Sequence, residues 1–382
     1  MYFPRPILFV VSLVALLAAS CSSEHGGGEE PSPGKTVGIA FGCSNDAWQE
    51  DPSTRAAGEQ TGLETLFSSF RVWGYKTTAS NDVQTVMDGY HVAYANASAG
   101  SSLTNTADWE YVGIKNPQLG TAQQIKYWDF SAADYRFFGY SPFDTEGVST
   151  AATNGMVSAF SFPYSFSTAA KALTMPYVSN LWYARPPSGS VVSLTFAPLI
   201  AKVRFRFIYP DDTEEVTASD ITFCDSRFAD APATATTPLR GTVTASYPIE
   251  GLPSGDQPQL SWTPSEGDGT VGQIMLTVPY EEAADRIHIL TDEAQYEKWY
   301  YVPPLNIIPY EQGAYTLSLR INGKLKTAVV PAQFMQWAAG YQYTYIFKLT
   351  DDYSVITFAD LQVEQWLPGS NIDNNGSGTE QW

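Results

Sequence analysis

The sequence predicts an all-β protein, and three observations support this class. Aromatic residues make up 14% of the chain, and 29 Gly and 25 Pro residues are spread along it. Aromatic and β-branched side chains favour strands, whereas Gly and Pro favour the turns between them. Short runs in which apolar residues occupy every second position recur along the chain, and Asn322-Gly323 between two such runs is a strong hairpin signal.

Length and charge limit the possible functions. The chain has 382 residues, a length typical of about two domains. Its net charge is −19, from 21 Lys and Arg against 40 Asp and Glu. This balance argues against a nucleic-acid partner and against a polybasic membrane-binding patch, because both require clustered positive charge.

Residues 1–20 predict an export signal followed by a lipid anchor. Arg5 precedes an apolar run from Ile7 to Ala19, which is too short to cross a bilayer comfortably. Ala18-Ala19-Ser20-Cys21 resembles a bacterial lipobox, which implies that Cys21 is acylated; the alternative is an ordinary secretory signal with an incidental cysteine. Residues 21–34 are polar and rich in Gly and Pro, so we expect a flexible tether.

Residues 35–43 are expected to form the first strand. The apolar residues occupy every second position: Val37, Ile39, Phe41 and Cys43. Small residues separate them, so one face of the strand suits a core. A polar stretch follows, and then Arg55-Ala56, where a protease cleaving after Arg55 would separate this strand from everything downstream. A sandwich that loses such a strand would be left with an open groove.

Further strands are expected in the first half of the chain at residues 70–76, 87–94, 109–114 and 132–140. In the first of these, Phe70 and Val72 lie on one face while Trp73 and Tyr75 lie on the other. Two apolar faces predict a strand that is covered on both sides.

Pro186-Pro187-Ser188-Gly189 is the best candidate for a domain boundary, because it is rigid and polar between two apolar patterned regions. We therefore expect an N-terminal domain at 35–185, a C-terminal domain at 190–368 and a polar tail at 369–382. Later strands are expected at 203–207, 274–278, 314–321, 325–330 and 341–349. Residues 231–237 and 253–272 are rich in Thr, Pro, Ser and Gly, which favours loops.

Several aromatic-rich segments resemble, in the right order, the signatures of the fimbrillin family, the type V pilins of Bacteroidetes. They are Phe70-Arg-Val-Trp-Gly-Tyr-Lys76, Asp108-Trp-Glu-Tyr-Val112, Ile125-Lys-Tyr-Trp-Asp-Phe130, Asp134-Tyr-Arg-Phe-Phe-Gly-Tyr-Ser-Pro142, Leu181-Trp-Tyr-Ala184, Val192-Ser-Leu-Thr-Phe-Ala-Pro-Leu-Ile-Ala-Lys-Val-Arg-Phe205 and Trp337-Ala-Ala-Gly-Tyr-Gln-Tyr-Thr-Tyr345. The resemblance covers nearly the whole chain. One departure is Pro198, where many relatives carry histidine.

This resemblance implies two tandem Greek-key β-sandwich domains related to the transthyretin-like fold. It also implies a structural pilus subunit, not an enzyme, that is exported as an outer-membrane lipoprotein and needs no cofactor. A trypsin-like protease would cleave after Arg55 and release residues 35–43, and other pilin subunits would then bind by donor-strand exchange. Glu29-Glu30 resembles the surface-export signal of Bacteroidetes lipoproteins. A stalk role is favoured over a tip role because the arginine is present.

A donor strand should show the same alternation as residues 35–43. Such a pattern occurs near the C-terminus, at Leu361, Val363, Gln365 and Leu367. Residues 371–381 contain one apolar residue, Ile372, which is a weak donor tail and leaves open a tip subunit that accepts a strand but donates poorly.

The alternative from another class is a surface glycan-binding lipoprotein, because sugars stack on exposed aromatic rings. The candidates outside the resembling segments are Trp299-Tyr300-Tyr301 and Trp366, together with Trp182. A hydrolase is a more distant alternative, since adjacent pairs such as Glu281-Glu282 are expected by chance among 40 acidic residues. Cys43 and Cys224 are expected to be reduced and buried rather than paired, because they fall in different predicted domains.

Overall fold

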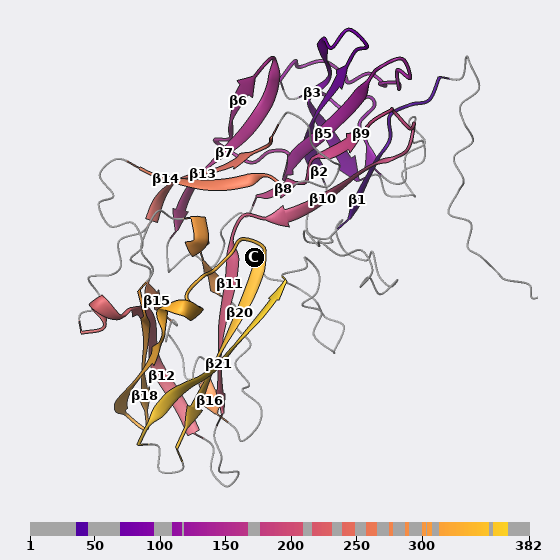
Figure 1. Ribbon diagram of the computed structural model, residues 1–382. Coiled ribbons are helices and arrows are strands. Elements are labelled where there is room, and N and C mark those ends of the chain that lie inside the picture. The colour runs from indigo at the N-terminus through magenta and orange to yellow at the C-terminus, as the bar shows by residue number, and fades with distance from the viewer. Residues whose placement is uncertain are drawn as a thin grey trace, which may run out of the picture. The chain divides into compact units, whose positions relative to one another are not determined.

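The protein is described by a computed structural model (Figure 1). The described residues are 36–44, 69–94, 109–116, 118–166, 176–208, 216–230, 239–248, 257–265, 275–277, 287–289, 300–302, 304–307, 313–350 and 354–365. Within these ranges the regular elements are β-strands and short 3-10 helices, the latter at Ser226–Phe228, Leu305–Ile307 and Ala332–Phe334. The predicted all-β class is confirmed.

The largest sheet has eight strands in the order β2-β3-β4-β1-β10-β8-β5-β9. The bounds are β1 Phe41–Ser44, β2 Ser69–Thr77, β3 Val83–Tyr94, β4 Trp109–Glu110, β5 Asp134–Ser141, β8 Tyr177–Ser179, β9 Trp182–Ala184 and β10 Val192–Pro198. An additional pairing joins β2 to β5. Because β5 also pairs with β8, all of these strands except β9 form a closed ring, and β1 closes it between β4 and β10.

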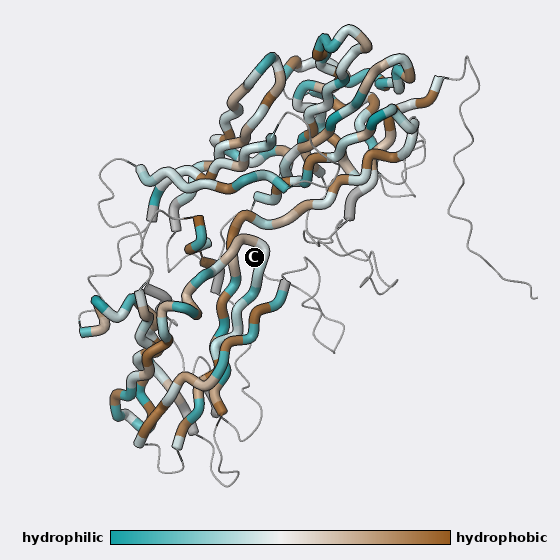
Figure 2. The backbone as a smooth tube through the Cα atoms, viewed as in Figure 1, coloured by the Kyte–Doolittle hydropathy of each residue, from teal (hydrophilic) through white to brown (hydrophobic). Residues whose placement is uncertain are grey.

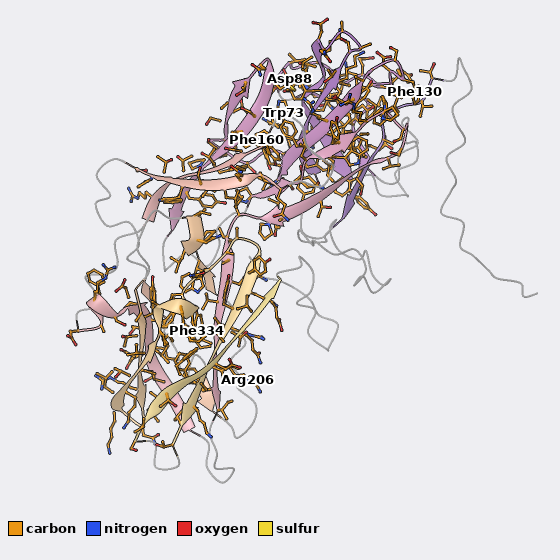
Figure 3. The ribbon with its side chains drawn as sticks, viewed as in Figure 1. Trp73, Asp88, Phe130, Phe160, Arg206 and Phe334 are labelled. Atoms are coloured by element: carbon orange, nitrogen blue, oxygen red, sulfur yellow. The ribbon has the colours of Figure 1, made fainter. Side chains whose placement is uncertain are left out.

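A second sheet covers the outer face of this ring. Its order is β14-β13-β7-β6, with β14 Gln259–Pro264, β13 Leu239–Ser246, β7 Met156–Phe166 and β6 Ser149–Thr153. The rings of Trp73 and Phe160 pack between the sheets with centroids 4.9 Å apart (Figure 3). Phe138 and Tyr247 stack in the same layer at 4.5 Å. Strand β2 is therefore covered on both sides, as its two apolar faces predicted.

The chain does not divide at residues 186–189 as expected. Strand β10 pairs with β1 and β8, and β13 pairs with β7 and β14, so residues 192–198, 239–246 and 259–264 contribute to the first sandwich rather than the second. The expectation of a loop at 253–272 is wrong at β14. There Trp262 is buried and Leu260 is half-buried, while Gln259, Ser261 and Thr263 are polar and exposed, so a period of two is hidden in a polar composition.

The remaining strands form the second sandwich. One sheet has the order β17-β11-β20-β21, with β11 Ala201–Ile208, β17 Tyr300–Val302, β20 Tyr341–Leu349 and β21 Ile356–Gln365. The other has the order β15-β12-β18-β19, with β16 on β12, and its bounds are β12 Val216–Asp225, β15 Met275–Thr277, β16 Ile287–Ile289, β18 Tyr315–Ile321 and β19 Lys324–Val330. Phe223 joins the two sheets, because its ring lies 5.2 Å from both Phe205 and Tyr345. Hydrophobic and hydrophilic stretches, brown and teal, both occur along these strands (Figure 2).

Local turn chemistry sets where strands end. The β18–β19 hairpin turns at Asn322 and Gly323, whose φ angles are 50° and 77°, which confirms the predicted hairpin. The strand expected at 109–114 is shorter, since β4 ends at Glu110 and Gly113 has a φ of 79°.

Candidate functional site

The candidate site is the place that β1 and the residues just before it occupy in the first sandwich (Figure 1). Strand β1 runs parallel to β10 with pairs from Phe41↔Val192 to Ser44↔Thr195, and among the described residues its pairing with β4 is Phe41↔Trp109. Before β1, the Ile39 N–H donates to the Lys126 carbonyl at 2.7 Å, and Gly38 lies opposite Tyr127. The edges of this segment are thus held largely by main-chain pairing, which any strand of suitable side chains can provide.

Two side chains of this segment fill the core. Ile39 and Phe41 are both 0% exposed. The Phe41 ring meets the rings of Phe70, Tyr111 and Phe137 edge-on, with centroid distances of 5.9, 5.9 and 5.8 Å. Burying two such side chains contributes about 3 to 6 kcal/mol. Loss of the segment would therefore open an aromatic pocket in the core.

The Tyr111 hydroxyl lies beneath this segment. It donates to the Ile39 carbonyl oxygen at 3.0 Å and accepts from the Lys126 N–H at 3.1 Å. The Lys126 carbonyl, at 3.4 Å, is a second acceptor within reach. Burial raises the pKa of Tyr111 above its ordinary value, so the hydroxyl stays protonated and able to donate at physiological pH.

Residues 122–130, which we call the strap, form one side of the site and are held without β1. Lys76 Nζ contacts Asp129 at 2.6 Å, and this hydrogen bond is the main reason that the pKa of Asp129 falls to about 2. The Asp129 N–H donates to the Tyr135 hydroxyl at 2.8 Å. Gln123 donates to the carbonyls of Tyr111 and His91 at 2.8 and 2.7 Å. The strap therefore has contacts that would keep its shape if β1 left.

The predicted residues of the removable strand are only partly described. Ile39 and Phe41 lie in the core as their alternation predicted, whereas Val37 is half-buried. Cys43 pairs with Leu194 through the main chain, but its side chain lies outside the described residues. Cys21, Arg55, Ala56 and Leu367 also lie outside them.

The candidate donor residues lie in β21, the edge strand of its sheet, which pairs with β20 from Tyr341↔Gln365 to Leu349↔Ile356. An irregularity at Ala359 divides β21, because Phe358 pairs with Phe347 and Asp360 with Ile346. Ile356, before the irregularity, is 3% exposed, while Val363, beyond it, is 48% exposed and Leu361 is half-buried. The second half of β21 thus contributes less to its own core.

Of the aromatic residues considered for glycan binding, Trp182 packs against Trp128 and Phe137, with centroids 5.9 and 5.8 Å away. The Trp182 ring is therefore largely packed against the core. Trp299 and Trp366 lie outside the described residues, as do the side chains of Tyr300 and Tyr301. Cys224 is a free, buried thiol, and burial raises its pKa to about 11.

Neither a metal centre nor a membrane span was found in the part of the chain that the structure describes. There, His, Cys, Asp and Glu do not gather into a cluster that could hold a metal ion. The same residues include no helix long and apolar enough to cross a membrane.

Fold and site together define an all-β protein of packed sheets whose first strand closes a ring over an aromatic pocket. The sequence profile of the fimbrillin-like family matches residues 54–366, and the chain belongs to this family. As a member, it is a fimbrial protein of the cell surface. No curated protein matches the sequence.

Solved structures similar to this chain come from Bacteroides and Parabacteroides species. A candidate cell adhesion protein from Bacteroides ovatus has 13% identity and a TM-score of 0.45, covering 87% of this chain and 98% of its own. A candidate cell adhesion protein from Bacteroides uniformis has 11% identity and a TM-score of 0.42, covering 87% and 99%. A fimbrial assembly protein from Parabacteroides distasonis has 10% identity and a TM-score of 0.35, covering 87% and 96%.

Proposed function

We propose that this chain is the precursor of a pilus subunit that assembles by exchanging β1 for a strand of another subunit. The observation that carries the proposal is the position of β1 and the residues just before it, which fill the core with Phe41 and Ile39 and yet precede Arg55 in the chain. The family match begins at residue 54, next to Arg55, so β1 lies outside the shared region. Cleavage after Arg55 by a trypsin-like protease would free β1 to leave.

An open groove with an apolar pocket and unpaired strand edges strongly favours a replacement strand. In a polymer of this chain alone, residues 361–367 are the candidate donor, because β21 is an edge strand and Val363 is exposed. Residues 356–358 would stay in the core of their own subunit. The Arg55 site favours a stalk role, since an unprocessed anchor would have no use for it.

The chain reaches the outer membrane as a lipoprotein in this proposal, with the lipid on Cys21. Metabolic labelling with a fatty acid tests this step. The wild type should be labelled and Cys21→Ser should not, and equal labelling of both would remove the anchor from the proposal.

The assembly step is tested with purified, folded precursor treated with a trypsin-like protease. Cleavage should give Ala56 as the new N-terminus and SDS-resistant ladders, whereas Arg55→Ala should stay intact and monomeric. A chain ending at Asp360 and the variant Val363→Asp should form fewer ladders. If cleaved wild type stays monomeric under all conditions, strand exchange is wrong, and if both donor variants form ladders as well as wild type, the donor assignment is wrong.

A further inference from the structure

The groove around β1 has two deep side-chain positions, and one small residue, Ala40, separates them in the segment that fills it. Ile39 and Phe41 point inward and are fully buried. Gly42 faces the other way, and a Cβ atom added there would lie 3.3 Å from Val191 Cγ1. The groove therefore fits a strand with large inward side chains and small outward ones.

The second of these positions suits an aromatic ring. Phe41 makes edge-on contacts to three rings, with interplanar angles of 77°, 79° and 85° to Phe70, Tyr111 and Phe137. Such pairs contribute beyond the area that they bury. A valine at this position would make none of them and would leave a void, which protein cores tolerate poorly.

The candidate donor of this chain does not carry an aromatic ring at the matching spacing. Leu361 and Val363 are both aliphatic. Ile356 and Phe358 have the right spacing, but Phe358 packs on Phe334 and Phe347 at 5.0 and 5.9 Å in the second sandwich. If Ile356 and Phe358 left to fill the groove of another subunit, the core of the donor subunit would open.

A hydrogen bond and the two pockets together fix the position of the strand along the groove. The Tyr111 hydroxyl donates to the Ile39 carbonyl, and the Lys126 N–H that it accepts from belongs to the strap. A strand displaced by two residues would still offer a carbonyl to Tyr111 and would keep the same face inward. However, Ile39 or Cys43 would then replace Phe41 against the three rings, so the hydrogen bond and the aromatic contacts are satisfied together in one register only.

We propose that this groove selects a strand with an aliphatic and an aromatic side chain separated by one small residue, that the aromatic side chain sets the register of the strand, and that Tyr111 anchors it. The preferred occupant is a strand of a partner subunit with this pattern, and residues 361–367 of a second copy bind more weakly. This inference rests on the strand exchange proposed above, and it names which strand the groove prefers.

Three labelled peptides test the selectivity on protein cleaved after Arg55 and freed of its N-terminal segment. They are residues 36–44, the same peptide with Phe41→Val, and residues 360–367. The first should bind most tightly. The Phe41→Val peptide should have an affinity lower by about tenfold or more, because three aromatic contacts are lost. Residues 360–367 should also bind more weakly than the first peptide. If all three bind equally, the selectivity is wrong while strand exchange stands. If none binds, including the chain's own strand, the exchange itself is refuted.

Disulfide trapping tests the register. After cleavage, Cys224 is the one native cysteine left in the protein, and it is buried. Each peptide carries Cys43→Ser, because residue 43 is itself a cysteine. Protein with Val191→Cys should trap a 36–44 peptide carrying Gly42→Cys, but not peptides carrying cysteine at position 40 or 44 instead. Phe41→Val in these peptides should spread trapping to the other positions, because the three ring contacts no longer favour one register. Adding Tyr111→Phe to the protein should weaken binding about threefold to tenfold, the usual effect of one hydrogen bond, and should leave the pattern unchanged. Trapping that stays at position 42 alone with the Phe41→Val peptides would overturn the register assignment.

Discussion

At the scale of single residues, Phe41 links the stability of the precursor to its proposed assembly. Its ring is fully buried among three others, and the same ring leaves the core when β1 leaves. Phe41→Ala should lower the free energy of unfolding of the uncleaved chain by about 3 to 5 kcal/mol, as measured by urea denaturation. Val37→Ala is the matched control, because Val37 is half-buried, and its effect should be less than half as large. Equal effects would show that β1 is not anchored by Phe41.

Cys224 gives a second prediction at this scale. Its pKa is raised to about 11, chiefly by burial, so the reactive thiolate is scarce at neutral pH. The pKa of Cys224 is higher in the folded than in the unfolded state. The contribution of the protonated thiol to folding stability is therefore complete below the unfolded-state pKa and is lost as the pH rises towards 11. Iodoacetamide should alkylate Cys224 slowly at pH 8 in folded protein and quickly in urea, as measured by mass spectrometry. Fast alkylation of the folded protein at pH 8 would contradict the buried thiol.

At the scale of elements, strong local patterns predicted strands well. Strand β20 has the bounds expected from its alternation, and the β18–β19 hairpin follows from Asn322-Gly323. Strands β6, β7 and β13 are among those that were not predicted, and β14 was expected to be a loop. Small and polar residues dominate the outward positions of these strands. These segments form strands because they pair with segments that are distant in the sequence. In the candidate site, alternation pointed to Ile39 and Phe41, but Tyr111 and the strap depend on long-range contacts that sequence does not show.

The two halves of β21 should respond differently when a charged side chain is introduced. Phe358 packs on Phe334, Tyr345 and Phe347, so Phe358→Asp should destabilise the chain by more than about 3 kcal/mol. Val363 is 48% exposed, so Val363→Asp should change stability by less than about 1 kcal/mol. Thermal and urea unfolding of both variants check this. A similar loss in both would mean that residues 361–365 are as firmly bound as residues 356–358 and are unsuited to leave.

At the scale of the whole molecule, β1 has an unusual place for a first strand. It closes a ring of strands in the first sandwich, and it lies upstream of Arg55 and downstream of the proposed lipid anchor at Cys21. Once cleavage lets β1 leave, the same step would release the protein from the membrane and open the ring. This coupling would delay assembly until the subunit has reached the surface.

Electron cryomicroscopy of filaments isolated with an antibody to this chain tests the central claim most directly. The account predicts that each subunit in the filament begins at Ala56. It also predicts that the density in the pocket of Phe70, Tyr111 and Phe137 belongs to a strand of the neighbouring subunit. Filaments whose subunits keep their own residues 36–44 in that pocket would contradict the account.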